Sequence, residues 1–335
     1  SRFGMRRPYL FVGTIAAVGS LVFLTTATSV PALMAAWALT QLTFNILLAG
    51  LNPIMPDQTP KHQLGRVSAL VGITQTLSAV GGAFIVQQFL PDLNRAILVP
   101  GIFTIVGVGV LLVVLKDRIL PREQAQKLDA LIILKAFWTN PRKAPDFALA
   151  WVSRFMVTFG NMTLAAYQVY FLMDRLGYTQ ANIGGAVLQL TLATTITTVI
   201  MSLIVGRISD RINRRKLFVL ISAIVLAVAH AAVLLASDLT GVLIAASIAG
   251  LATGIYTAVD SALIAEVLPS SKDVAKDMGV LHLANVFPQM LVPIVAPFFL
   301  AIGSVNHTNY AALFIGGAVI GIIGAIVNQF IKSVR

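Results

Sequence analysis

The sequence predicts an all-α integral membrane protein, and three observations support that prediction. Of the 335 residues, 57% are hydrophobic and 11% are charged, whereas soluble domains carry about 25% charged residues. The mean hydropathy is +0.87. The hydrophobic residues form long runs without the alternating pattern of β-barrel strands. This composition excludes soluble enzymes, disordered tails and nucleic-acid-binding modules.

Ten segments of the chain are long and apolar enough to cross a membrane as helices, which takes about 20 residues each. They are residues 8–28, 31–55, 66–89, 94–115, 147–172, 181–206, 217–236, 240–265, 278–302 and 309–331. A charged loop separates the first four segments from the last six. We therefore expect a first bundle within residues 1–115, a central cytoplasmic loop at 116–146 and a second bundle within residues 147–335.

The basic residues predict the orientation of these helices, because cytoplasmic loops carry an excess of Lys and Arg. If the chain begins in the cytoplasm, 21 of its 24 Lys and Arg residues fall in cytoplasmic loops. Arg95 and Arg175 fall in the opposite loops, and Arg154 lies within a span. We expect a multi-pass protein of the cell membrane with both ends of this chain in the cytoplasm. The net charge of +11 then reflects topology rather than binding to nucleic acid.

Two unrelated patterns recur in the chain with the same offset of 209 residues. The basic stretch SRFGMRR around Arg2 returns as DRINRRK around Arg211, and DQTP at 57–60 returns as EVLP at 266–269. The two bundles therefore represent a parallel duplication. The second bundle has two spans before its basic loop that the first bundle lacks. We expect two further helices in the intact protein and a chain truncated at its N-terminus, where Ser1 stands in place of an initiator Met.

Both basic stretches resemble signatures of a transporter family. GRISDRINRRKLF, at residues 206–218, resembles the loop signature Gly-x-x-x-Asp-Arg-x-x-Arg-Arg of the major facilitator superfamily. The resemblance implies two parallel six-helix halves, of which ten helices are present here. SRFGMRRPYLFVG, at residues 1–13, resembles the Arg-Phe-Gly-Arg-Arg-Arg-Pro signature of the glycoside–pentoside–hexuronide and sucrose-type sugar symporters, with Met5 in place of one Arg.

The resemblance implies that this loop belongs to the latch that closes the cytoplasmic side of such carriers. It assigns Asp210, Arg211 and Arg215 to one half of the latch and Gly206 to the glycine of the motif. Arg-rich turns pair with carboxylates and helix C-termini, and such pairs break and re-form between two states. The expected partners are Asp57, Arg66, Glu266 and Lys276. The alternative is that these residues only fix the topology.

Arg154 and Asp260 are predicted to form an ion pair inside the membrane, where an unpaired charge is costly. Each lies six to seven residues from the same side of the membrane, roughly 10 Å deep at about 1.5 Å per residue. Breaking and protonating this pair would couple transport to an ion gradient. The alternatives are a static pair and an Arg154 side chain that extends to the interface. His282 is a second candidate proton carrier or a packing residue, and His230 is expected to be structural.

Polar residues recur at helical spacing along one face of each of four spans. Such faces predict a central cavity for a neutral, hydroxyl-rich solute. The expected contacts are Gln41, Asn45, Gln75, Asn161, Gln168, Asn285 and Gln289. The alternative is that these amides only bond one helix to another. The Thr-rich segment at 191–200 is expected to bond back to carbonyl groups of its own helix.

The resemblance and the polar faces predict a secondary active transporter that works by alternating access. Proton- or sodium-coupled uptake of a sugar or glycoside is the favoured function, and drug or metabolite efflux by proton antiport is the alternative. A non-transporting membrane sensor is a remote alternative. The sequence has no nucleotide-binding motif, no Cys and only four separated His residues. We therefore expect no enzyme activity, cofactor or metal, and the partners are the solute, the coupling ion and the lipid bilayer.

Overall fold

The computed structural model describes residues 6–51, 54, 58–60, 63–115, 117, 141–142, 144–212, 214–267, 274–304 and 308–333. Within these ranges 88% of the residues are helical and none belongs to a strand. The described helices number ten, in agreement with the predicted all-α class. They fall into two compact units, residues 1–127 and 128–335, and the division lies inside the expected loop at 116–146.

The first unit contains four described helices. They are α1 (Arg7–Thr26), α2 (Val30–Leu51), α4 (Leu64–Phe89) and α5 (Leu93–Val114). Helix α1 packs on α2 and α5, and α4 packs on α5. A small core of Leu10, Leu47, Val108 and Leu115 joins α1, α2 and the end of α5.

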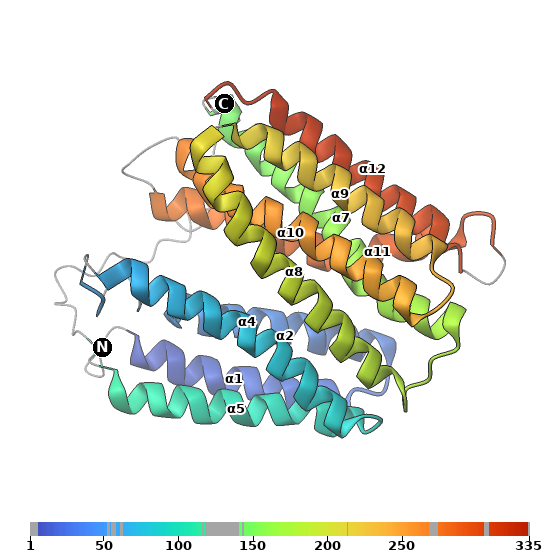
Figure 1. Ribbon diagram of the computed structural model, residues 1–335. Helices are drawn as coiled ribbons and strands as arrows, with labels where there is room; N and C mark the ends of the chain where they lie inside the picture. The colour runs from blue at the N-terminus through green and yellow to red at the C-terminus, as the bar shows by residue number, and fades with distance from the viewer. Residues whose placement is uncertain are drawn as a thin grey trace. The chain divides into compact units, whose positions relative to one another are not determined.

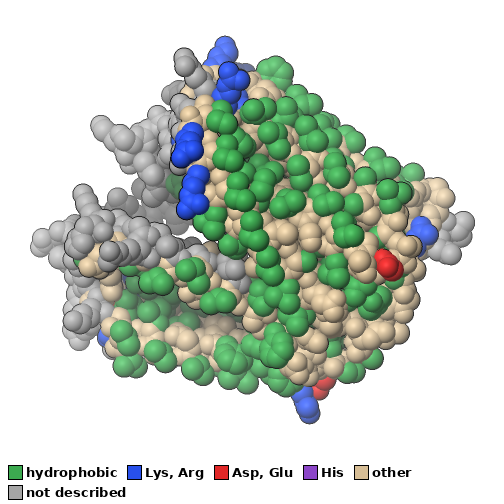
Figure 2. Space-filling view, in the orientation of Figure 1, with side chains coloured by type: hydrophobic (Ala, Val, Ile, Leu, Met, Phe, Trp, Pro, Cys, Tyr) green, Lys and Arg blue, Asp and Glu red, His purple; other side chains and the backbone are tan. Residues whose placement is uncertain are grey.

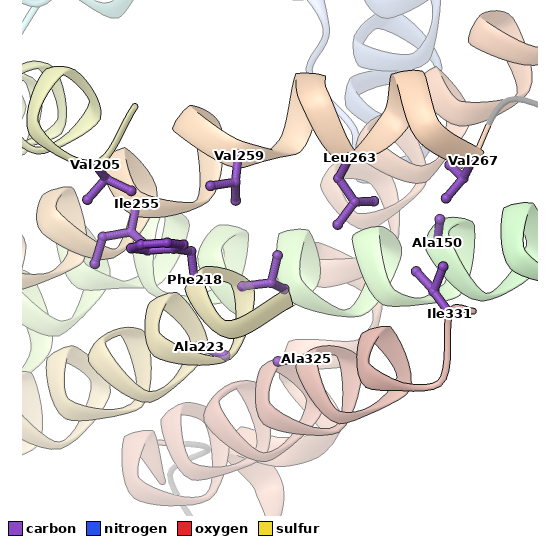
Figure 3. Close-up of a cluster of buried hydrophobic side chains, with 11 residues drawn as sticks. Ala150, Val205, Phe218, Ala223, Ile255, Val259, Leu263, Val267, Ala325 and Ile331 are labelled. Atoms are coloured by element: carbon purple, nitrogen blue, oxygen red, sulfur yellow. The ribbon is translucent and has the colours of Figure 1, made fainter. Parts of the chain in front are cut away.

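The second unit contains six described helices, and Figure 1 shows α12, α9 and α7 side by side within it. They are α7 (Pro145–Leu176), α8 (Ile183–Ile212), α9 (Arg215–Leu235), α10 (Leu239–Val267), α11 (Val274–Ala301) and α12 (Tyr310–Gln329). Phe218 of α9, Ile255 and Val259 of α10 and Ala325 of α12 are buried in one hydrophobic cluster (Figure 3). This cluster holds the helices that carry the candidate site.

The observed helices match the predicted spans, but several extend beyond them. Helix α8 continues to Ile212, six residues past the predicted end at 206, and α7 continues to Leu176. The prediction ended each span where the apolar run ended, whereas backbone hydrogen bonds continue through polar residues. Helix α7 stops at Gly177, whose φ of 71° is the left-handed conformation that glycine adopts readily.

Eight of the ten described helices are long and apolar enough to cross a membrane. Helices α4 and α7 are not among the eight. Several side chains of α4 lie outside the described part of the chain. Helix α7 has a continuous polar stripe that includes Arg154, Asn161 and Gln168, and this stripe lowers its hydropathy. The most polar described helix is therefore the one on which the candidate site is built.

The visible face of the second unit is suited to lipid. Ile196, Ile200 and Leu203 of α8 are 51–61% exposed, and hydrophobic side chains cover much of this face in Figure 2. Lys and Arg side chains gather where α8 ends and α9 begins. An apolar band bounded by basic residues is the pattern expected of a membrane-spanning bundle.

The predicted offset of 209 residues also relates the helices of the two units. It carries Val30, the first residue of α2, onto Leu239, the first residue of α10. It carries the starts of α1 and α4 to within one residue of the starts of α9 and α11. Among the described helices of the first unit, none corresponds to α7 or α8. The two further helices expected from the sequence remain a prediction.

Helices α8 and α10 approach each other closely because of two glycines and two threonines. A Cβ atom at Gly254 would lie 2.6 Å from the carbonyl oxygen of Thr198, so only glycine fits there. Thr198 Oγ1 donates a 3.0 Å hydrogen bond to the carbonyl of Gly250, and Thr194 Oγ1 donates one of 3.4 Å to Ala246. Small residues and hydroxyl groups are the usual means of close packing between membrane helices.

This result corrects one expectation about the Thr-rich segment. Thr191 and Thr197 do bond back to carbonyl groups of α8, as predicted. Thr194 and Thr198 instead bond across to α10. The prediction considered α8 alone, whereas the glycines of α10 bring a second set of carbonyl groups within reach.

Candidate functional site

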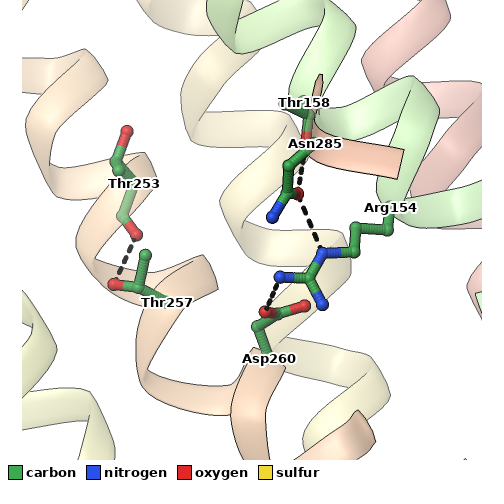
Figure 4. A network of polar contacts seen from close by, with 6 residues as sticks. All are labelled: Arg154, Thr158, Thr253, Thr257, Asp260 and Asn285. Carbon is green, nitrogen blue, oxygen red and sulfur yellow. Dashed lines mark hydrogen bonds and ion pairs between the residues drawn. The ribbon is translucent and has the colours of Figure 1, made fainter. Parts of the chain in front are cut away.

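The candidate site lies inside the second unit and centres on an ion pair between α7 and α10. Arg154 Nη2 lies 3.0 Å from Asp260 Oδ2 (Figure 4). Each of these side chains is only 16% exposed. The structure therefore contains the ion pair that the matched depths in the sequence predict.

Asn285 of α11 extends the pair into a network of three helices. Arg154 Nε donates a 2.9 Å hydrogen bond to Asn285 Oδ1, and Thr158 Oγ1 donates a 3.4 Å bond to the same oxygen (Figure 4). The guanidinium group thus uses separate nitrogens for the carboxylate of α10 and the amide of α11. Because its donors are arranged in a rigid fork, Arg154 fixes both neighbours relative to α7.

Further polar contacts continue along the same two helices. Asn161 Nδ2 donates a 2.7 Å bond to Thr253 Oγ1, which joins α7 to α10 a second time. Tyr256, one turn before Asp260 on α10, lines a small cavity together with Asp260. The carboxylate therefore has a cationic partner on α7 and a phenol side chain of its own helix nearby.

Aromatic side chains flank the polar network on the side of α11. Trp151 stacks on Phe155 with ring centroids 5.6 Å apart and meets Phe287 edge-on at 6.4 Å. Its Nε1 donates a 2.9 Å hydrogen bond to the carbonyl of Val280. Flat rings beside amide and guanidinium groups offer both stacking and hydrogen bonding to a solute.

A second set of polar contacts ties the helix ends together on the side where α7 and α9 begin. Asp146 accepts hydrogen bonds from the backbone nitrogens of Lys332, at 3.1 Å, and Ser333, at 2.7 Å. Burial acts to raise the pKa of Asp146, but these donors and the charge of Lys216 outweigh it, so the pKa lies below its usual value of 3.8. Lys216 also donates to the carbonyls of Gln329 and Ile331 at the end of α12.

The equivalent position in the first unit makes the same kind of contact. Arg7, which lies 209 residues before Lys216, donates a 2.7 Å bond from Nη2 to the carbonyl of Leu115 at the end of α5. A cation at a helix C-terminus satisfies free carbonyl groups and opposes the helix dipole. In both units the basic residue of the repeated motif thus anchors the end of the last described helix.

The structure unites only some of the predicted site residues. Arg154, Asp260 and Asn285 meet in one network, and Asn161 joins the same two helices. Gln168 is half-buried farther along α7. His282 and Gln289 are exposed on α11.

The predicted solute contacts of the first unit lie on α2 and α4. Gln41 is half-buried, and Asn45 and Gln75 are exposed. Asn45 donates to the carbonyl of Gln41 one turn earlier. Their grouping with residues of the second unit stays a prediction.

The predicted latch residues are only partly within the structure. Gly206 lies on α8, Arg211 is exposed near the end of that helix, and Arg215 is half-buried at the start of α9. Asp57 lies outside the described residues. The side chains of Arg66, Asp210, Glu266 and Lys276 also lie outside them, although the backbones of these four residues are helical.

Sequence reasoning missed three polar residues around the ion pair. Tyr256 lies four residues before Asp260, a spacing that places both on one helix face and that could have revealed it. Ser153 and Asn328 are buried beside the pair and line one small cavity with it. No spacing rule connects Asn328 of α12 to Asp260 of α10, since only tertiary packing brings them together.

The helical bundle and its apolar exterior define the class of multi-pass membrane proteins, and the family match that follows points to a transporter rather than an enzyme. A family description, Major Facilitator Superfamily, matches residues 1–194 and again residues 150–334. The chain belongs to the Major Facilitator Superfamily. A search of curated proteins gives no match to this sequence.

Solved structures agree with this assignment of the fold. The chain is similar to a bacterial homolog of the human lysosomal transporter Spinster in an inward-facing, unoccupied conformation, with a TM-score of 0.69, 15% identity and coverage of 99% of this chain and 85% of the other. The occupied conformation of that homolog gives a TM-score of 0.68 at 15% identity, with coverage of 99% of this chain and 83% of the other. A POT family transporter in complex with a thioalcohol-conjugated peptide gives a TM-score of 0.72 at 11% identity, with coverage of 97% of this chain and 81% of the other.

Neutralising one partner of the ion pair should destabilise the second unit. We expect Arg154→Gln and Asp260→Asn each to cost about 3 to 5 kcal/mol, because each leaves a buried charge without its partner. The double variant should lose less than the sum of the two. Thermal unfolding of the purified protein in detergent measures the stability that each variant loses. Arg95→Gln is the control, since its pair with Asp92 is exposed and contributes about 1 kcal/mol or less. Additive losses would contradict the pairing.

The contact of Asp146 with the end of α12 should make stability depend on pH. Because the folded pKa is lower than the unfolded one, the contact stabilises the protein above pH 3.8 and is lost as the pH falls through the lowered pKa. We expect Asp146→Asn to lower the free energy of unfolding by up to about 1 kcal/mol at neutral pH, since the contact is partly exposed. In acid the same substitution should change it little. Lys332→Gln is the control, because only its backbone donates. A pH-independent loss in Asp146→Asn would count against this account.

Proposed function

We propose that this transporter couples solute movement to a proton gradient through the Arg154–Asp260 pair. The observation that carries the proposal is the placement of this pair, 16% exposed, between two helices of the same unit. When Asp260 takes up a proton, the carboxyl group loses its charge and its attraction to Arg154 weakens. Helices α7 and α10 then separate more easily at this point. Charge change at a buried pair is a general way to bias two states of a bundle.

Arg154 favours a proton over a sodium ion as the coupling ion. A guanidinium nitrogen 3.0 Å from the carboxylate already supplies the positive charge that a metal cation would bring, and it repels a second cation. A proton instead binds covalently to the carboxyl oxygen and needs no ligand shell. Asn285 keeps Arg154 attached to α11 through the 2.9 Å bond to Nε while the carboxyl group is neutral.

We propose a sugar or glycoside as the solute. The resemblance of residues 1–13 to sugar symporters supports this choice. The half-buried amides of Asn161, Gln168 and Asn285 offer donors and acceptors to hydroxyl groups. Trp151, three residues before Arg154 on α7, offers a flat ring. The remaining amide contacts proposed from the sequence are Gln41, Asn45, Gln75 and Gln289.

We also propose that alternating access uses the repeated loop motif as a latch on the cytoplasmic side. In this proposal Asp210, Arg211 and Arg215 pair with acidic and basic residues of neighbouring loops when the transporter faces outward. The cytoplasmic side is the one where α7, α9 and α11 begin, because the basic residues Arg207, Arg211 and Arg214 are exposed there. Both ends of this chain are then cytoplasmic, in the cell membrane.

Uptake by cells that express the full-length protein tests this function. We expect labelled sucrose or a related disaccharide to accumulate and the accumulation to collapse when a protonophore removes the gradient. Arg95→Gln should accumulate the sugar like the wild type, because its ion pair is exposed and outside the site.

Two results would redirect the proposal. Accumulation that survives the protonophore but requires sodium would show that sodium, and not the proton, is the coupling ion. A failure to accumulate any disaccharide at normal expression would contradict the sugar assignment. Proton-dependent efflux of an amphipathic dye would then support the export function.

A further inference from the structure

A small cavity adjoins the ion pair on the side of the helix ends. Its volume is about 10 Å³. Five of its lining residues are polar, namely Ser153, Arg154, Tyr256, Asp260 and Asn328, and the others are aliphatic side chains from α7, α9, α10 and α11. All described lining residues of the cavity thus belong to the second unit.

Asn328 contributes a buried hydrogen-bond donor that lacks a partner in the described part of the chain. The residue is 1% exposed, and its Nδ2 atom makes no hydrogen bond there. A buried polar group without a partner is unfavourable, and such groups are usually satisfied by protein or ordered water. A cavity needs about 10 to 15 Å³ of this kind of volume to hold one water molecule. The volume, the polar lining and the unpaired donor therefore all match a single water.

The charges around the cavity favour a neutral molecule over an ion. Arg154 of α7 and Asp260 of α10 compensate each other at 3.0 Å. Among the described lining residues Tyr256 is the other titratable group, while α9 and α11 contribute aliphatic side chains. A cation would meet both the guanidinium group and the amide donor of Asn328, and an anion would meet the carboxylate. Water can accept from Asn328 Nδ2 and donate to the carboxylate.

We propose that this cavity binds one water molecule between Asn328 Nδ2 and the Asp260 carboxyl group, and that this water carries the proton of Asp260 to and from the helix ends. Asn328 lies one residue before the end of α12, so the water occupies the shallow side of Asp260. The carboxyl group gives its proton to the water, and the water releases one of its own protons to the solvent at the helix ends. The carboxylate is left paired with Arg154. The binding site stands on the cavity alone, whereas the proton route rests on the proposed coupling role of Asp260.

An experimental structure of the protein in lipid nanodiscs, at a resolution that shows ordered water, tests the binding site. We expect one water peak about 2.7–3.2 Å from Asn328 Nδ2 and no peak in Asn328→Leu, which fills the cavity with a side chain of similar size. An empty cavity in the wild type, or a direct protein partner for Nδ2, would overturn the site.

Infrared spectroscopy in D₂O tests the proton route without a transported solute. The carboxyl band of protonated Asp260 is assigned by its loss in Asp260→Asn, and its exchange of hydrogen for deuterium is followed in time. We expect exchange to slow about tenfold or more in Asn328→Leu and to stay fast in Asn328→Ser, which keeps a polar group. Thr163→Val is the control, because Thr163 is buried on α7 and bonds to its own helix.

The outcomes separate the two parts of the proposal from the proposed function. Unchanged exchange in Asn328→Leu would overturn the proton route even if the water is present. Slow exchange in Thr163→Val as well would also overturn it, since a general loss of packing would then explain the effect. A wild type that binds the water and exchanges rapidly, yet accumulates no solute with a proton gradient, would contradict the proposed function alone.

Discussion

The arrangement of the second unit depends on keeping two opposite charges together inside an apolar bundle. An isolated Arg154 or Asp260 within a membrane span is unfavourable, so each charge requires the other. Their 3.0 Å contact fixes α7 against α10, and the bond from Arg154 to Asn285 fixes α11 against both. Any process that removes the charge on Asp260 acts on three helices at once. The proposed coupling step thus uses the same contact that holds the helices together.

The surrounding scaffold is built to hold these helices in register. Glycines bring α8 and α10 within direct contact, and Thr198 bonds across that contact to Gly250. At the helix ends, Lys216 anchors the end of α12, and Arg7 makes the equivalent contact 209 residues earlier. The contacts of α8 with α10 and of Lys216 with α12 do not include Arg154 or Asp260. The second unit is therefore held by packing and helix-end contacts in addition to the ion pair.

Much of this could be predicted from the sequence, because membrane proteins obey strong rules of length and charge. Runs of apolar residues predicted all ten helices, and matched depth predicted the Arg154–Asp260 pair. The offset of 209 predicted the relation between helices of the two units. The sequence did not predict that Asn285 bonds to Arg154 or that Asn328 lies beside Asp260. Such contacts depend on which faces of α11 and α12 turn toward α7 and α10, and tertiary packing decides that.

We propose that the Arg154–Asp260 pair couples transport to the proton gradient in addition to packing the helices together. The most direct measurement uses proteoliposomes that contain either the wild type or Asp260→Asn, with labelled disaccharide as the probe. It compares accumulation driven by a pH gradient with the exchange of external for internal sugar. We expect Asp260→Asn to exchange external for internal sugar but no longer to accumulate it with a pH gradient. Accumulation at the wild-type level in Asp260→Asn, or a loss of both activities in a variant that is still folded, would contradict it.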